Sequence, residues 1–171
     1  MNHPELPQNI ELDIPCGALG ATHRHRTTHT RGLTHNAAAG RAERQGATMS
    51  EHDEQKALFE WAAWNQGHEP APCLLFAIPN GGLRMPAVAG KLKAEGLKPG
   101  VPDVYLPVAR LGYHGFWIEM KFGKNKTTIE QDVWLTALKA EGYMVDVSYG
   151  WQEAAHKIAR YLGREPQEFG L

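Results

Sequence analysis

Phe116-Trp117-Ile118-Glu119-Met120-Lys121-Phe122 is the most informative segment of the chain for its fold. Most of its residues are aromatic or aliphatic, which is typical of a strand inside a sheet. Glu119 and Lys121 interrupt the run, and because side chains alternate along a strand, both leave it on the same face. A carboxylate and an ammonium are costly to bury in a core. The pair therefore indicates either a salt bridge or a site with a chemical function.

A second strand is expected from Asp103 to Pro107, connected to the first by a glycine-containing turn at 110–115. Fifteen residues, 104–118, separate Asp103 from Glu119, which fits a strand, a turn and a returning strand. In such a hairpin Asp103 lies opposite Glu119. Two carboxylates suit a hard cation such as Mg²⁺, and a lysine beside them can orient water for phosphodiester hydrolysis. The plainer alternative is a Glu119–Lys121 salt bridge, with Asp103 capping a turn.

Helices and further strands flank this hairpin. Ser50 caps a first helix, and either Thr127 or Thr128 caps a later one that ends at 141. Other helices are expected at 86–95 and 151–162, and other strands at 73–78, which should be buried, and 143–149. Four tryptophans at helical core positions are expected to be packing residues: Trp61, Trp64, Trp134 and Trp151. This order predicts an α/β fold with a mixed central sheet flanked by helices.

The 171-residue chain has the composition of a globular protein, with 42% hydrophobic and 22% charged residues. No apolar run is long enough to span a membrane and two cysteines are too few for a disulfide framework, so we expect a cytoplasmic protein. The net charge is −1, but the segment from Arg84 to Lys126 carries eight basic and three acidic residues, a balance of +5. This segment predicts contact with a nucleic-acid backbone. The candidate contact residues are Asn80, Arg84, Lys98, Lys124 and Lys126.

Residues 1–49 differ from the rest of the chain. They contain no Phe, Trp or Tyr but five of the nine histidines, and they show neither helical nor strand periodicity. A segment without large apolar side chains cannot offset the entropy of ordering it. We therefore expect a disordered or non-native extension before a single domain at 50–171. The His-Arg run at 23–29 is interpreted as part of a flexible tail, with metal or nucleic-acid binding as the alternative.

Three short motifs, taken together, resemble a nuclease family. They are Gly100-Val101-Pro102-Asp103, Trp117-Ile118-Glu119-Met120-Lys121, and Glu130-Gln131 at the start of a helix. The set resembles the PD-(D/E)xK nuclease pattern and, more narrowly, the short phage-type branch of the VRR-NUC (virus-type replication-repair nuclease) domain. The resemblance implies a restriction-endonuclease-like αβββαβ core, DNA cleavage with Mg²⁺ or Mn²⁺, and a homodimer resembling Holliday-junction resolvases.

The resemblance also implies roles for particular residues. The positions that correspond to metal ligands are Asp103, Glu119 and the backbone carbonyl of Met120. Lys121 corresponds to the catalytic lysine, and Gln131 to a glutamine that hydrogen-bonds within the site. Glu51 corresponds best to the acid of the first helix, with Glu54 as the alternative.

The expected function is a structure-specific endonuclease for branched DNA, such as Holliday junctions or flaps, acting in replication, repair or recombination in a bacterial or phage-infected cell. Nothing in the sequence resembles an element that reads base edges, which favours recognition of DNA shape. An RNA-directed nuclease would have the same site, and a non-catalytic DNA-binding scaffold would keep the same fold. Both are alternatives at this point.

Overall fold

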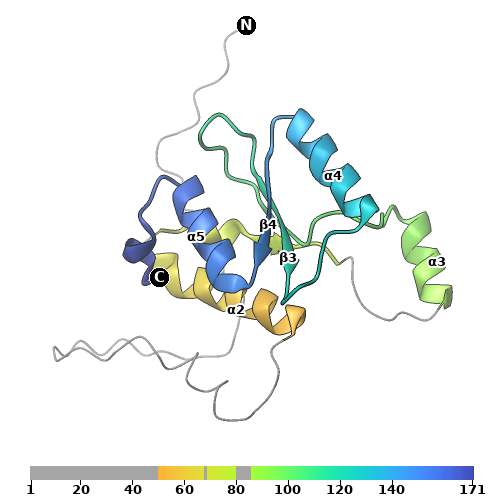
Figure 1. The fold of residues 1–171 in the computed structure, drawn as a ribbon, viewed down its shortest axis with the longest axis horizontal. Helices are drawn as coiled ribbons and strands as arrows, with labels where there is room; N and C mark the ends of the chain where they lie inside the picture. Colours follow the sequence, from red (N-terminus) through yellow and green to blue (C-terminus); the bar gives the residue numbers. More distant parts are fainter. Residues whose placement is uncertain (1–49, 68, 80–85) are drawn as a thin grey trace, which may run out of the picture.

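The structure is a computed structural model that describes residues 50–67, 69–79 and 86–171 (Figure 1). The expectations for 1–49, and those for Asn80 and Arg84, concern residues outside these ranges. The main helices are α2 (Glu51–Trp64), α3 (Pro86–Ala94), α4 (Ile129–Ala140) and α5 (Trp151–Tyr161). The strands are β1 (Phe76–Ala77), β2 (Val104–Leu106), β3 (Phe116–Lys121) and β4 (Met144–Tyr149). Short 3-10 turns lie at η1 (Asn65–Gly67), η2 (Ala71–Leu74) and η3 (Pro166–Phe169).

The four strands form one mixed sheet in the order β1-β2-β3-β4. β1 with β2 and β2 with β3 are antiparallel pairs, whereas β3 and β4 are parallel. The parallel pair requires a crossover connection, which α4 provides because it lies between β3 and β4 in the chain. The predicted α/β fold, with a mixed sheet flanked by helices, is confirmed.

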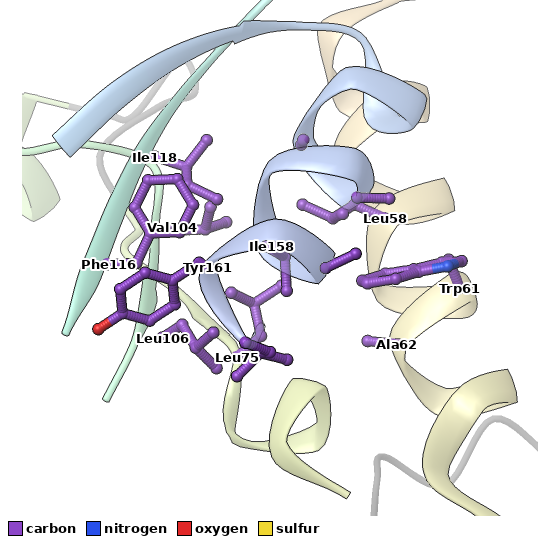
Figure 2. Close-up of a cluster of buried hydrophobic side chains, with 14 of the residues drawn as sticks. Leu58, Trp61, Ala62, Leu75, Val104, Leu106, Phe116, Ile118, Ile158 and Tyr161 are labelled. Carbon is purple, nitrogen blue, oxygen red and sulfur yellow. The ribbon is translucent and has the colours of Figure 1, made fainter. Parts of the chain in front are cut away.

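Helices α2 and α5 lie side by side against one face of the sheet, and α4 lies on the other side (Figure 1). The main core fills the space between the sheet and helices α2 and α5 (Figure 2). Phe116, Ile118 and Met120 alternate along β3 and are completely buried in this core. Trp117, Glu119 and Lys121 therefore leave β3 on the opposite face, toward α4.

Tyr161 near the end of α5 ties the β2–β3 connection to this core. Its ring packs against Phe116 at a centroid distance of 5.2 Å. Its hydroxyl donates to the Val108 carbonyl at 2.6 Å and accepts from the Arg110 backbone N–H at 3.2 Å. The hairpin that carries both strands of the candidate site is thus anchored at its far end.

The apolar run at 73–78 differs from the prediction of a buried strand. It begins inside η2, and only Phe76–Ala77 pair with β2, at the edge of the sheet. Leu75 enters the core, but Phe76 is 45% exposed. A short apolar run predicts burial from composition alone, and composition does not reveal whether a strand lies at the edge or in the centre.

The prediction that all four tryptophans lie in the core is also partly wrong. Trp61 is buried, but Trp64 is 77% exposed because the core-facing side of α2 carries Leu58, Trp61 and Ala62. Helix α4 contains no fully buried residue, and its Trp134 is only half-buried. The face of the sheet that α4 covers is therefore less completely shielded than the face beneath α2 and α5.

None of the helices in the described part of the chain is long and apolar enough to cross a membrane.

Helix α3 stands apart from the rest of the molecule (Figure 1).

Candidate active site

The hairpin register brings two carboxylates together at one end of the sheet. Val104 pairs with Ile118, so one residue further along the ladder Asp103 lies opposite Glu119. Oδ2 of Asp103 accepts a hydrogen bond of 2.8 Å from the Met120 backbone N–H. The backbone carbonyl of Asp103 accepts a further hydrogen bond of 2.7 Å from the N–H of Ile78. Both the backbone and the carboxylate of Asp103 are thus held in place.

Glu119 is the centre of this site and is completely buried. Its Oε1 accepts a hydrogen bond of 2.6 Å from the Lys121 ammonium and another from the Gln131 side-chain amide. Its Oε2 is buried and has no hydrogen-bond partner among the described residues. Burial raises the pKa of Glu119 to about 7; the Asp103 carboxylate also raises it, and the hydrogen bond from Lys121 opposes the rise. The charged form of Glu119 is therefore disfavoured when no cation lies beside it.

Lys121 is 5% exposed and keeps its positive charge in spite of that burial. Burial disfavours the ammonium, but the hydrogen bond to Glu119 and the carboxylates of Glu119, Glu51 and Asp103 outweigh it, and the pKa of Lys121 is raised. A lysine with a raised pKa is a poor proton acceptor at neutral pH. It is suited instead to orient a water molecule or to stabilise negative charge on a phosphate.

Gln131 connects the site to the start of α4. Thr128 caps this helix through a capping box in which Oε1 of Gln131 accepts from the Thr128 N–H at 2.8 Å. The Thr128 hydroxyl in turn accepts from the Gln131 N–H at 3.3 Å. Because the capping box holds the carbonyl oxygen, the amide nitrogen is directed at Glu119. One side chain thus both starts the helix and orients the buried carboxylate.

The two acids of α2 occupy different environments. Glu54 is buried, and its Oε2 accepts a hydrogen bond of 2.8 Å from the Trp151 N–H at the start of α5. The N-cap residue of α5 is Gly150, at φ 89°, which has no side chain with which to cap the helix. Glu54 provides that cap from another helix. Glu51 is instead one of the acids whose charge acts on Lys121.

Tyr149 is a residue at the site that the sequence did not single out. It pairs with Lys121 in the parallel β3–β4 register and is 48% exposed. Paired residues leave a sheet on the same face, so the exposed ring lies on the same face as the buried ammonium. In the sequence Tyr149 stands at the end of an alternating strand, but its register with Lys121 is a tertiary property.

The donor set fits a hard divalent cation. In residues 50–67, 69–79 and 86–171, no three His, Cys, Asp or Glu side chains gather closely enough to hold a metal ion. Asp103 and Glu119 nevertheless offer carboxylate oxygens, and Oε2 of Glu119 has no other partner among these residues. Mg²⁺ binds through one or two carboxylates and keeps waters or phosphate oxygens as its other ligands. Two acids with a backbone carbonyl such as that of Met120 are therefore sufficient protein ligands.

The three lysines predicted to contact nucleic acid all lie in the described residues. Lys124 and Lys126 are exposed in the loop between β3 and α4, immediately after the site. The Lys98 ammonium lies 5.8 Å from the ring centroid of Trp134 on α4. The Trp134 indole donates to the Pro99 carbonyl at 3.0 Å, which holds this segment against α4.

Comparison with known proteins supports the fold. A solved structure described as "VRR_NUC domain protein" is 26% identical to this chain, with a TM-score of 0.57. The similar region covers 70% of this chain and 93% of that one. No protein-family model and no curated protein matches the chain. The four-stranded mixed sheet flanked by helices is consistent with a VRR-NUC nuclease fold, and the similarity suggests a nuclease domain.

Proposed function

We propose that this protein is a Mg²⁺- or Mn²⁺-dependent endonuclease of the PD-(D/E)xK type that cleaves branched or flapped DNA. One observation carries the proposal. The buried Glu119, whose Oε2 has no partner among the described residues, lies beside Asp103 and receives hydrogen bonds from Lys121 and Gln131. A buried carboxylate with an unpaired oxygen lowers the stability of a protein, so its presence in a hydrogen-bonded group of this kind favours a catalytic role.

Each residue of the site has a distinct role in this proposal. Asp103, Glu119 and the Met120 carbonyl would hold a divalent cation, which when bound polarises the scissile phosphate and lowers the pKa of a water ligand. Lys121 orients the attacking water and offsets negative charge on the phosphate. Gln131 keeps the Glu119 carboxylate in position, and Glu51 helps to keep Lys121 charged.

The substrate and the assembly are part of the same proposal. Lys98, Lys124 and Lys126 would contact DNA phosphates, with Asn80 and Arg84 as further contacts, and the enzyme would act in replication, repair or recombination in the cytoplasm of a bacterial or phage-infected cell. We also propose a homodimer of the phage type. Two apolar side chains one turn apart on α4, Ile129 and Val133, are exposed, and a second copy would cover them.

The experiment that tests this function uses linear duplex, flapped and four-way DNA, each incubated with Mg²⁺, with Mn²⁺ or with a chelator. We expect internal cleavage of the flapped or four-way DNA that requires the metal and leaves 5′-phosphate ends. Matched RNA substrates separate a DNA enzyme from an RNA enzyme. Binding of branched DNA without cleavage under any of these conditions would support the non-catalytic scaffold and contradict the proposal.

A further inference from the structure

A row of three aromatic side chains crosses the sheet beside the candidate active site. Phe76 on β1 pairs with Tyr105 on β2, and Tyr105 pairs with Trp117 on β3. These residues leave the sheet on the same face as Glu119, because Trp117 and Glu119 are two residues apart on β3. The next row on that face contains Asp103 and Glu119. We refer to Phe76, Tyr105 and Trp117 as the aromatic row.

The aromatic row is held rigidly. The rings of Tyr105 and Trp117 stack at a centroid distance of 4.3 Å with an interplanar angle of 22°. Phe76 meets Tyr105 edge to face at 5.6 Å. A Cβ at Gly115 would collide with the Tyr105 ring and hydroxyl, so the absence of a side chain at Gly115 leaves room for the tyrosine. The row is therefore organised before any ligand arrives.

The row is accessible at its Phe76 end. Phe76 is 45% exposed, and Tyr105 and Trp117 are half-buried. α4, on this side of the sheet, packs against β4, at the opposite edge from β1. The indole nitrogen of Trp117 is buried, and Tyr105 also meets Tyr143 edge to face at 6.0 Å. The Phe76 ring is therefore the part of the row that a ligand can reach, backed by the two stacked rings behind it.

The surroundings of the row favour nucleic acid over an apolar partner. The adjacent row carries the carboxylates that would hold a cation, followed by the Lys121 ammonium, with Lys124 and Lys126 in the next loop. The distance between the rows is about 7 Å, two residues along a strand. This is about the distance between neighbouring phosphates in an extended single strand. A phosphate at the carboxylate row would thus place the neighbouring base over the aromatic row. Bases stack on aromatic side chains without regard to sequence.

We propose that the aromatic row binds an unpaired base next to the scissile phosphate, so that the preferred substrate has a single-stranded segment at the cleavage point. This inference rests on the proposed function and narrows it. A paired base cannot stack on the row without leaving its duplex, whereas a flap or a single-stranded branch presents such a base at no cost. Flapped DNA should therefore be a better substrate than a fully paired four-way junction.

The test compares Phe76→Leu, which removes the ring but keeps an apolar side chain, with Phe76→Tyr, which keeps the ring. Trp64→Leu is the matched control, because Trp64 is an exposed aromatic residue at the far end of α2. Each protein is mixed, with Mg²⁺ and separately with chelator, with a single-stranded oligonucleotide carrying 2-aminopurine at one position, and with the corresponding duplex. Thermal melting checks that each variant is folded.

We expect wild type, Phe76→Tyr and Trp64→Leu to quench 2-aminopurine fluorescence in the single strand. Phe76→Leu should lose that quenching and bind the single strand about tenfold more weakly, with unchanged binding of the duplex. Absence of quenching by wild type, or equal effects of Phe76→Leu on single strand and duplex, would overturn the inference. So would a change in the oligomeric state of Phe76→Leu without selective loss of single-strand binding, because a second copy would then cover the row.

Cleavage assays separate this inference from the proposed function. If wild type quenches 2-aminopurine but cleaves no DNA with any metal, the catalytic proposal fails and the binding row stands. If wild type and Phe76→Leu cleave flapped and four-way DNA with the same preference, the catalytic proposal stands and the inference about the row is wrong.

Discussion

The Lys121 ammonium donates to Oε1 of Glu119 at 2.6 Å, and both side chains are almost completely buried. The hydrogen bond from Lys121 lowers the pKa of Glu119, but burial has the larger effect and raises that pKa to about 7. Breaking a buried pair by removing one partner normally destabilises a protein strongly. A neutral residue of the same shape in place of Glu119 is a different case, because it removes the cost of a buried negative charge.

Glu119→Gln should therefore stabilise the metal-free protein above pH 7. A carboxyl whose pKa is raised on folding binds its proton more tightly in the folded state, so stability is lost as the pH rises from about 4.5 to about 7. The amide of the variant has no such titration. Thermal unfolding in chelator at pH 8.5 should show the variant more stable than wild type by up to about 3 kcal/mol.

The same comparison at about pH 4 provides the control, because the Glu119 carboxyl is then mostly protonated in both the folded and the unfolded state. The advantage of Glu119→Gln should shrink to near zero there. A variant that is less stable than wild type at pH 8.5 would show that the ion pair with Lys121 outweighs the burial of the carboxylate.

Mg²⁺ should stabilise wild type but not the variants that lack one of its ligands. A ligand that binds only the folded state raises the unfolding free energy. Once the ligand is in excess of its Kd, each tenfold rise in its concentration adds about 1.4 kcal/mol to that free energy. Wild type should therefore melt at a higher temperature in Mg²⁺ than in chelator, whereas Glu119→Gln and Asp103→Asn should show little change. Equal shifts in all three proteins would indicate that the cation binds elsewhere.

Lys121→Met should abolish cleavage without abolishing DNA binding. The substitution keeps the apolar part of the side chain and removes the group that we propose orients water and offsets phosphate charge, which is expected to slow the reaction at least about 100-fold. Single-turnover cleavage and binding of the same flapped DNA measure the two effects. Lys56→Met is the control, because Lys56 forms an exposed pair with Glu60 on α2. Wild-type cleavage by Lys121→Met would contradict the mechanism.

The two acids of α2 should behave differently on substitution. Glu54→Ala leaves the Trp151 N–H without its acceptor and should lower the unfolding free energy by about 1–2 kcal/mol. Glu54→Gln keeps an acceptor for this N–H and should therefore lose much less stability. Glu51→Gln should change stability by less than about 0.5 kcal/mol but lower the cleavage rate. If Glu54→Gln were the slower enzyme, the assignment of the two acids would be reversed.

Lys124 and Lys126 should contribute to DNA binding through phosphate contacts. Replacing both by alanine should weaken binding to all sequences equally and reduce the slope of log K against log salt by about 1 for each lysine. Titrations of flapped DNA over a series of salt concentrations give that slope. Lys139→Ala, at the exposed C-terminal end of α4, should leave the slope unchanged.

The helices and the central hairpin could be predicted because their signals are local. Ser50 with Asp53 and Thr128 with Gln131 form capping boxes over three residues, and both are present. The alternation that places Glu119 and Lys121 on one face is likewise a property of one strand. The exposure of the run at 73–78 could not be predicted in this way, because it depends on which strands lie beside it.

The amino-acid sequence alone was enough to indicate which side chains can meet at one end of the sheet, because hairpin length and the period of two place Asp103, Glu119 and Lys121 on a common face. How those groups are partnered became clear only from the folded chain. Folding directs Glu54 to a helix N-terminus 97 residues away, leaves Oε2 of Glu119 unpaired among the described residues, and aligns Phe76 with Tyr105 and Trp117 beside the acids. Hydrogen bonds, burial and lateral register between distant segments depend on how the whole chain packs, and no local pattern encodes them.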